Sequence, residues 1–427
     1  MSDDLNSPAH QRWLRTRDDV LRHAPLQAVR HALMSRCSSS LEAWLVGGAL
    51  RDLLLGVQPR EYDIAVNGDA IRVGRQLAAA GGRFIAEHPA FGTCEVELLI
   101  DGSSPVRLDI AGLRSEHYSV SGALPDVAPA HDIAIDLVRR DFTINSLALQ
   151  LTPGLGDGVI DMCGGAVDLT TGMIRVLHDD SFLDDPTRIF RAARYAARYG
   201  ELESHTQSLI DRAVECGAIE SISAARVMSE LRLVLSEMPA RQVDTALSLL
   251  DEWGLLERIL PLGARHEVRL PGVDHMHDVP VAAPPDELWL ARMASMLVDV
   301  DRDAIRLWCA DAGMPSGEVR RLLHLAAMQQ QLEHGVPVAV LLRVPRETIV
   351  DAVASWGKEL TQDWLRLHDA AREFITGSDL QAHGISDGPQ LGAMLHDVRT
   401  GILEGRITTR EEALGMLKEL IEHAEEA

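Results

Sequence analysis

The sequence changes character at about residue 180, and this change limits the folds open to the chain more than any other feature. Before it, short β-branched runs such as Tyr62–Val66 and Val106–Ile110 alternate with helical patterns such as Ala49–Leu55. After Asp184 the chain is rich in Leu, Ala and Arg with a 3.6-residue apolar period, and strand patterns become rare. We therefore predict an α+β protein, with a mixed sheet and helices first and helices alone afterwards. Further strands are predicted at Glu42–Val46 and Cys94–Ile100, and a further helix at Ile71–Ala80.

The composition is that of a globular chain with enough apolar residues to bury large cores. Of the 427 residues, 46% are hydrophobic and 25% are charged, which predicts roughly two to four domains. No apolar run approaches the roughly 18 residues that cross a bilayer, and Met1–Asn6 does not read as the start of a signal peptide. Five scattered cysteines without a CxxC pair argue against a disulfide scaffold. These features predict a cytoplasmic protein without membrane contact.

The net charge of −23 argues against a protein that coats nucleic acid without regard to sequence. It leaves room for a local groove lined by arginine. Arginine is also the better bidentate ligand for phosphates and bases.

A glycine pair between a strand and a short helix is the first candidate for a binding site. Gly47 and Gly48 would let the backbone approach a phosphate closely, and the helix that follows offers free N–H groups and a positive dipole end. Arg51 lies one turn into this helix, where it could reach a triphosphate. Taken alone, a glycine pair before a helix is usually only a tight turn.

Two carboxylates follow this helix on the next predicted strand. Glu61 and Asp63 are two residues apart, so their side chains should point to one face. Two oxygen-rich side chains on one face suit a pair of Mg²⁺ ions in phosphoryl transfer. A lone Glu-x-Asp is usually a solvated face, but its combination with the glycine turn in one strand–turn–helix–strand unit is far more specific.

A predicted helix near residue 190 carries a stripe of arginines. Arg188, Arg191, Arg194 and Arg198 fall within an arc of about 120°, and Asp185 lies beside it. The spacing alone leaves two interpretations open. One is a solvated face with ion pairs. The other is an anion-binding face on which an aspartate and an arginine present acceptors and donors to a base edge.

The order of these motifs resembles the polymerase-beta-type nucleotidyltransferases, and more narrowly the class II tRNA nucleotidyltransferases (CCA-adding enzymes) and the bacterial poly(A) polymerases. The blocks that extend the resemblance reach from about residue 40 to about residue 420. They are Leu137–Ser146, similar to the family's RRDFTIN block; Asp161–Leu169 with Ile174–Val176, similar to its D-P-x-G-G-x-x-D-L…IRV segment; Asp184–Arg198, similar to its EDPxRxLRAxRFAAR helix; and Gly377–Gly392 in the tail.

The resemblance implies a polymerase-beta-type head with a mixed sheet, followed by an all-helical neck, body and tail. The implied ranges are a helical extension at 1–40, the head at 41–170, the neck at 171–240, the body at 241–330 and the tRNA-binding tail at 331–427. The implied activity is CCA addition to the 3′ end of tRNA from CTP and ATP with two Mg²⁺ ions. The oligomeric state stays open.

The resemblance also implies a role for each matching residue. Glu61 and Asp63 would be the catalytic residues that bind Mg²⁺, and the nucleotide would be bound by Gly48, Arg51, Arg140, Asp185, Arg188, Arg191 and Arg194. Asp185 and Arg188 would select the base, and Gly48 and Arg51 would cradle the phosphates. Two weaker candidates keep alternatives: Asp109 is a third carboxylate or a solvated core edge, and Asp141 serves the site or caps a turn.

Two departures from the family pattern bear on activity. Glu61 stands where the family normally has aspartate, and the segment Tyr118–Pro125 lacks the arginine expected before Pro125. In the family that loop matters for the switch from C to A addition. The alternatives are therefore a poly(A) polymerase or A-only adding enzyme, or a catalytically weakened RNA-binding relative. His275–Asp278 superficially resembles a metal-binding HD motif, but no second HD pair follows, so a loop cluster without metal is favoured.

Overall fold

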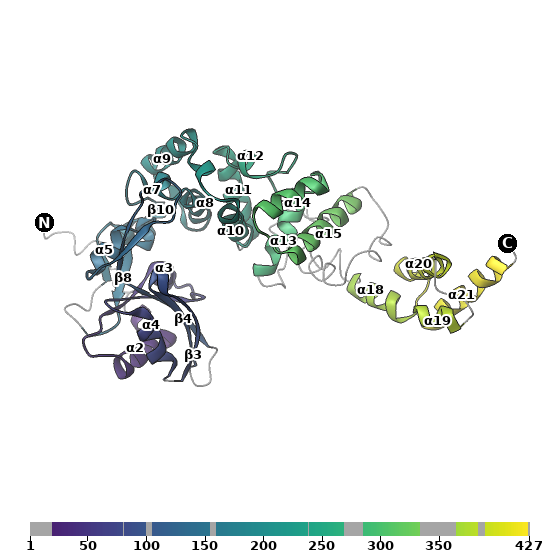
Figure 1. Cartoon of the computed structure of the whole chain (residues 1–427), viewed down its shortest axis with the longest axis horizontal. Helices are drawn as coiled ribbons and strands as arrows, with labels where there is room; N and C mark the ends of the chain where they lie inside the picture. Colours follow the sequence, from purple (N-terminus) through teal and green to yellow (C-terminus); the bar gives the residue numbers. More distant parts are fainter. Residues whose placement is uncertain are drawn as a thin grey trace. The chain divides into compact units, whose positions relative to one another are not determined.

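The computed structural model describes residues 19–79, 81–99, 105–153, 159–237, 239–268, 285–333, 364–382 and 389–425. The chain divides into two compact units, Met1–Ile222 and Ser223–Ala427. Figure 1 shows the sheet and its helices in the first unit and helices in the second. The predicted α+β class, with a mixed-sheet head before a helical region, is confirmed. The predicted five-part division stays a prediction.

The first unit is built on a seven-stranded mixed sheet with the order β3-β4-β5-β2-β1-β8-β9. The central pair β2 and β5 is parallel, and the other neighbours are antiparallel. Strand β1 is buried along its whole length, as expected for an apolar run at the centre of a covered sheet. The strands are β1 Ala43–Val46, β2 Tyr62–Val66, β3 Gly82–His88, β4 Thr93–Leu98, β5 Val106–Gly112, β8 Leu147–Gln150 and β9 Val159–Asp161.

Helices and two small sheets complete the first unit. Helix α4 has Val73 and Leu77 on its buried face, and Gly74 lets it approach the sheet closely, because a Cβ there would lie 2.4 Å from the sulfur of Cys94. The helices are α2 Ala24–Arg36, α3 Gly47–Leu54, α4 Ala70–Ala78, α5 Ile133–Val138, α6 Gly165–Thr171, α7 Ser181–Asp184, α8 Thr187–Tyr199 and α9 Ser204–Glu215, with the 3₁₀ turn η3 at Thr143–Asn145. The small sheets pair β6 Arg114–His117 with β7 Asp126–Pro129, and β10 Met173–Ile174 with β11 Glu201–Leu202.

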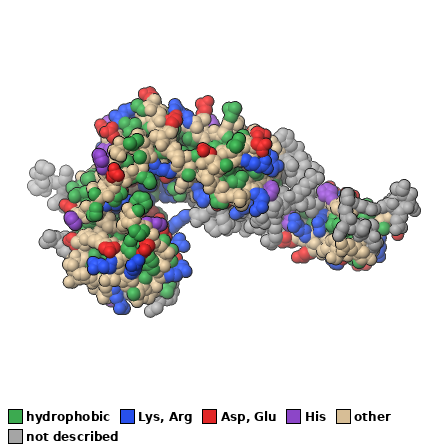
Figure 2. All heavy atoms as spheres, in the orientation of Figure 1, with side chains coloured by type: hydrophobic (Ala, Val, Ile, Leu, Met, Phe, Trp, Pro, Cys, Tyr) green, Lys and Arg blue, Asp and Glu red, His purple; other side chains and the backbone are tan. Residues whose placement is uncertain are grey.

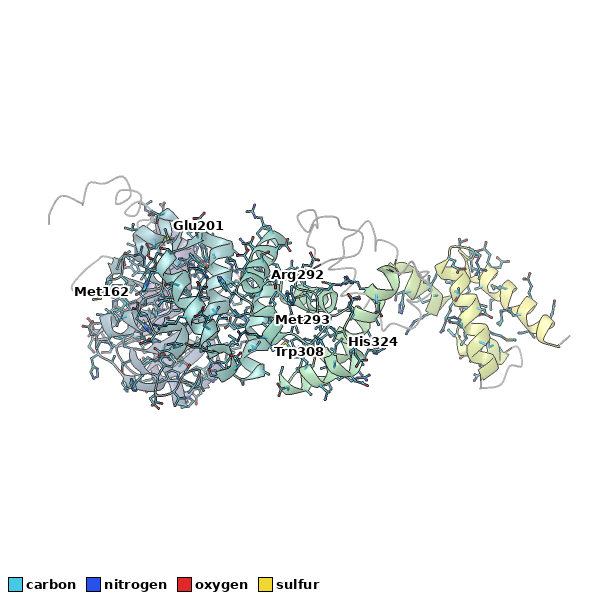
Figure 3. All side chains as sticks on the ribbon, turned by 90° about the horizontal axis from the view of Figure 1, so that it is seen from above. Met162, Glu201, Arg292, Met293, Trp308 and His324 are labelled. Carbon is cyan, nitrogen blue, oxygen red and sulfur yellow. The ribbon has the colours of Figure 1, made fainter. Side chains whose placement is uncertain are left out.

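The described part of the second unit contains helices and no strand. Arg292, labelled in Figure 3, is buried and donates to the backbone oxygens of Leu235 (2.6 Å) and Glu237 (3.0 Å), where it satisfies carbonyls at the end of α10. The helices are α10 Ala224–Leu235, α11 Ala240–Glu252, α12 Leu256–Ile259, α13 Pro285–Met296, α14 Arg302–Asp311, α15 Ser316–Glu333, α18 Trp364–Glu373, α19 Gly377–Ala382, α20 Pro389–Leu403 and α21 Arg410–Glu425.

The last helix begins with a reciprocal cap. The backbone N–H of Glu412 donates to Thr409 Oγ1, and the backbone N–H of Thr409 donates to Glu412 Oε2, both at 3.2 Å. This is the capping box that the sequence pattern Thr-x-x-Glu predicts. The His275–Asp278 cluster lies outside the described residues. Among the helices that are described, none is long and apolar enough to cross a membrane.

Candidate active site

Two aspartates lie side by side on the parallel pair at the centre of the sheet, with Glu61 near them. Asp63 is the second residue of β2, and its register partner on β5 is Asp109. Register partners on neighbouring strands present their side chains to the same face. Glu61 lies one residue before β2 begins, so its predicted place on the strand itself is wrong by that one residue, and its side chain is exposed. Its charge nevertheless acts on both aspartates.

Burial raises the pKa of Asp63 to about 6, with the Glu61 charge adding to the rise and Arg140 opposing it. Burial also raises the pKa of Asp109 to about 6, with further contributions from the charges of Glu61 and Asp63. The arrangement concentrates negative charge that a cation would neutralise.

The donor set fits Mg²⁺ held jointly by protein and nucleotide. Within the described ranges, no three His, Cys, Asp or Glu side chains are grouped so that they could hold a metal ion. Mg²⁺ commonly takes only one or two protein carboxylates and completes its octahedral shell with substrate phosphates and water. Glu61 and Asp63 supply the hard oxygen ligands that this mode of binding needs.

The glycine turn holds Asp63 against the start of α3. Gly47 has φ +64°, and a Cβ at this position would lie 3.0 Å from Arg140 Nη1 and 3.2 Å from Asp63 Oδ2. The backbone N–H of Ala49 donates to Asp63. The free N–H groups predicted for a phosphate therefore include at least one that the Asp63 carboxylate already uses.

Arg51 is buried between α3 and α8, with only 4% of its surface exposed. Its Nη1 donates to Asn145 Oδ1 at 2.6 Å, and its Nε and Nη2 pair with Asp52 Oδ1 at 2.9 and 2.8 Å. Its guanidinium carbon also lies 4.5 Å from the ring centroid of Tyr199 and 5.3 Å from that of Tyr195. The structure thus places this residue inside the fold, where the sequence had suggested a side chain reaching toward a triphosphate.

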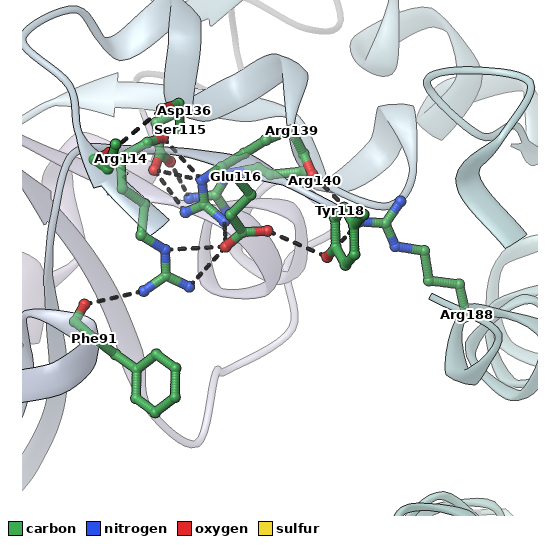
Figure 4. Close-up of polar contacts among 10 residues, drawn as sticks. Phe91, Arg114, Ser115, Glu116, Tyr118, Asp136, Arg139, Arg140 and Arg188 are labelled. Carbon is green, nitrogen blue, oxygen red and sulfur yellow. Dashed lines mark hydrogen bonds and ion pairs between the residues drawn. The ribbon is translucent and has the colours of Figure 1, made fainter. Parts of the chain in front are cut away.

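Arg140 is held over the site by a buried aspartate. Its Nη2 donates to Asp136 Oδ2 at 2.8 Å, while Arg139 Nη2 donates to the other oxygen at 2.6 Å. Burial alone would raise the pKa of Asp136, but these two guanidinium groups lower it. Figure 4 shows the network continuing from Arg139 to Glu116 and from Glu116 to Tyr118.

Arg188 and Asp185 stand at the start of α8. Arg188 is 5% exposed, and its Nη1 donates to Ser181 Oγ at 2.7 Å. Its Nη2 lies 3.4 Å from the Arg139 backbone oxygen, and its guanidinium lies over the Tyr118 ring at 5.8 Å, as Figure 4 shows. Asp185 Oδ1 accepts from the N–H and the hydroxyl of Thr187, at 3.1 and 2.7 Å.

Further along α8, Arg191 and Arg194 are half-buried. Arg191 Nε donates to Asp141 Oδ2 at 2.7 Å. Burial would raise the pKa of Asp141, but Arg191 and the Asn145 amide outweigh it and lower the pKa to about 2. Asp141 thus joins the predicted site to α8, while it also accepts from the Phe142 backbone N–H at 2.8 Å.

Sequence reasoning missed four residues in the network of contacts around the predicted ones: Asp136, Glu116, Tyr195 and Tyr199. Helical spacing could have identified two of them. Asp136 precedes Arg139 and Arg140 by three and four residues, and Tyr195 follows Arg191 by four. Tyr199 and Glu116 carry no such mark, since they join the site through Arg51 and Arg139, which lie far from them in the sequence.

The chain is similar to known proteins, both over the segment that contains these carboxylates and over most of its length. Residues 43–175 match the family model described as "Poly A polymerase head domain". An A-adding tRNA nucleotidyltransferase of Geobacter sulfurreducens is 30% identical over 90% of this chain, and the chain spans 46% of that relative's length. An A-adding tRNA nucleotidyltransferase of Halalkalibacterium halodurans is 28% identical over 90% of both chains. A solved apo form of a CCA-adding enzyme is 26% identical with a TM-score of 0.69, over 95% of this chain and 98% of that one.

Proposed function

Because the chain belongs to the family of class II tRNA nucleotidyltransferases and bacterial poly(A) polymerases, we propose that it transfers nucleotidyl groups from CTP and ATP to the 3′ end of tRNA and completes the CCA sequence. One observation carries this proposal: the register of β2 and β5 sets Asp63 beside Asp109, close to Glu61 and to the glycine turn. Paired carboxylates at such a place suit nucleotidyl transfer.

Glu61 and Asp63 would hold Mg²⁺ together with the phosphates of the nucleotide. The ion would polarise the phosphoryl group and lower the pKa of the attacking 3′-hydroxyl when it is bound. Gly48 would keep the backbone accessible beside the phosphates, and Arg140, held by Asp136, would place positive charge next to Asp63.

Helix α8 would read the base and steady the nucleotide. Asp185 and Arg188 offer an acceptor and donors at its start, and the contacts of Arg188 with Ser181 and the Arg139 carbonyl support a fixed direction. Arg191 and Arg194 would lie against the nucleotide one and two turns later. The helices of the second unit would bind the tRNA by shape and backbone contacts.

A second candidate, addition of the terminal A alone, is favoured by two observations. The relatives from Geobacter sulfurreducens and Halalkalibacterium halodurans, each matched over 90% of this chain, are named A-adding tRNA nucleotidyltransferases. In addition, the segment Tyr118–Pro125 lacks the arginine that the family pattern carries before Pro125. We also propose a cytoplasmic location, which is supported by the five cysteines, all of them within the described residues and all free.

Three tRNA transcripts separate these activities. They end before CCA, after C and after CC, and each is incubated with Mg²⁺ and labelled CTP or ATP. Addition of C, C and A in turn, with a stop after A, supports CCA synthesis. A single A on only the CC-ended transcript identifies an A-adding enzyme, and long A tails identify a poly(A) polymerase. No incorporation despite tRNA binding overturns the proposed activity.

A further inference from the structure

Five side chains from three segments close into a ring beside the candidate site. Arg51 Nη1 donates to Asn145 Oδ1 at 2.6 Å, and Asn145 Nδ2 donates to Asp141 Oδ1 at 3.0 Å. The second oxygen of Asp141 accepts from Arg191 Nε at 2.7 Å, and Arg191 Nη2 donates to the Tyr195 hydroxyl at 3.1 Å. The Tyr195 ring lies 5.3 Å from the guanidinium of Arg51, which closes the ring.

The members of this ring differ in their access to solvent. Arg51, Asp141, Asn145 and Tyr195 are each less than one-tenth exposed, whereas 36% of the Arg191 side chain is exposed. The ring therefore has one member that an incoming nucleotide can reach. Two of the buried members, Asp141 and Tyr195, accept hydrogen bonds from it.

The contacts of Arg51 leave it poorly placed to touch a phosphate. Each of its three nitrogens donates to Asn145 or Asp52, and Tyr195 and Tyr199 lie near its guanidinium. A buried guanidinium with these partners would have to give up several charge-assisted contacts before it could bind a phosphate. The same contacts suit a residue that joins α3 to α8.

We propose that Arg51 is a positioning residue, which acts through Asn145, Asp141 and Tyr195 to fix Arg191 for the triphosphate of the nucleotide. The inference rests on the proposed function, and it replaces the phosphate-binding role that the family resemblance implies for Arg51. Arg191 contacts the nucleotide, and Arg51 sets its direction from inside the fold.

Two tyrosines on α8 give a matched test. Tyr195→Phe removes the hydroxyl that accepts from Arg191, while Tyr199→Phe removes a hydroxyl that donates to Asp52 outside the ring, at 3.1 Å. Both changes keep an aromatic ring beside Arg51. We expect Tyr195→Phe to raise the KM for the nucleotide by about 3- to 10-fold with little change in kcat, and Tyr199→Phe to change it by less than about twofold.

A double-mutant cycle tests the route from Arg51 to Arg191. Lysine lacks the planar fork that Arg51 uses, so Arg51→Lys should raise the nucleotide KM about tenfold in the wild-type background. In the Arg191→Lys background the same change should cost less than about twofold, because its effect passes through Arg191. If the two fold-changes multiply, Arg51 binds the nucleotide independently and the inference is wrong.

The remaining outcomes are equally decisive. If Tyr195→Phe lowers the melting temperature but leaves the KM unchanged, the ring is only structural and the inference fails. It also fails if both tyrosine variants raise the KM alike. If Arg51→Lys does not fold, the tyrosine pair decides alone. If the wild type extends no tRNA, the proposed function fails, and binding of ATP and CTP measured by isothermal titration calorimetry still tests the ring.

Discussion

Asp63 is subject to forces that act on its charge in opposite directions. Burial and the neighbouring Glu61 favour its protonated form, while Arg140 and the Ala49 N–H favour the carboxylate. A divalent cation bound beside Glu61 and Asp63 would tip this balance toward two ionised ligands. The proposed binding of Mg²⁺ can therefore be tested by changing one of these two carboxylates.

Glu61→Gln keeps the size of the side chain and removes its charge. We expect the Mg²⁺ concentration that gives half-maximal incorporation to rise by about tenfold or more, because a neutral amide is a weaker ligand for Mg²⁺ than a carboxylate. The matched control is Glu95→Gln on β4, a carboxylate that lies opposite Asp109 on the other side from Asp63. Identical Mg²⁺ titrations for wild type and Glu61→Gln would contradict the assignment of Glu61.

The lowered pKa of Asp141 predicts that the stability of the fold depends on pH. Its pKa is about 2 in the folded chain against an ordinary value of 3.8, so its ionised form stabilises the fold by about 2 kcal/mol above pH 4. That contribution should disappear as the pH falls from about 4 to about 2, since protons then compete with Arg191.

Denaturant unfolding at a series of pH values checks this expectation. The free energy of unfolding of Asp141→Asn should lie below that of the wild type at pH 5, and the gap should narrow toward pH 3. Asp126→Asn, an exposed change on β7, serves as the control. A gap that stays constant over this range would show that the Asp141 charge does not provide the stability.

At the scale of the element, close approaches between backbones fix the walls of the site. Helix α6 begins at Gly165 and packs on η3, the turn that carries Asn145. A Cβ on Gly165 would lie 2.0 Å from the backbone oxygen of Thr143. Glycine is therefore required here by the neighbouring backbone.

Gly165→Ala should lower the free energy of unfolding by about 1–3 kcal/mol, because a carbonyl oxygen cannot move aside as a flexible side chain can. Thermal unfolding of the variant measures the loss. Gly68→Ala in the same unit is the control, since its Cβ meets nothing within 4 Å and should change stability by less than about 0.5 kcal/mol. Equal melting temperatures for Gly165→Ala and the wild type would refute the packing argument.

The sequence predicted those strands and helices in which apolar residues recur with a clear period. The predicted strand Tyr62–Val66 agrees with β2, because its apolar positions are buried in the sheet. Strand β3 was not predicted: it lies at the sheet edge with mostly exposed or half-exposed residues, so burial imposes little pattern on it. The hairpin of β6 and β7 was not predicted either, because its residues are also exposed or half-exposed.

In the candidate site, too, some features could be predicted from the sequence and others could not. The nearness of Glu61 to Asp63 could be predicted from the sequence, because the two residues lie in one short segment. The surroundings of Arg51 could not, because Asn145 and Tyr199 lie 94 and 148 residues further along the chain and meet it only in the folded protein. Spacing in the sequence predicts which partners a side chain could reach, but tertiary packing determines which partners it contacts.

At the scale of the whole molecule, the net charge has to be reconciled with the proposed RNA partner. The chain carries a net charge of −23, and on the face drawn in Figure 2 acidic and basic side chains are interspersed over the described residues. Binding to tRNA should therefore depend on a limited number of arginine contacts and on shape.

This view predicts a modest dependence of tRNA affinity on salt. Between 50 and 200 mM KCl the affinity should fall by about 10- to 100-fold, which is less than for proteins with six to ten phosphate contacts. Fluorescence anisotropy with a labelled transcript measures it. An affinity that does not change with salt would mean that phosphates play no part, and a fall of about 10⁴-fold would mean an extensive basic surface.

The most direct test of the account measures incorporation of labelled CMP and AMP into tRNA transcripts by the wild type and by Asp63→Asn, with Mg²⁺ present. The account predicts Mg²⁺-dependent incorporation by the wild type and a rate lower by about 10³-fold or more in the variant, because a metal-binding carboxylate is lost. Melting temperature and tRNA affinity should stay close to those of the wild type. Equal incorporation by both proteins, or none by the wild type, would contradict the assignment of Asp63 as a catalytic residue for nucleotidyl transfer to tRNA.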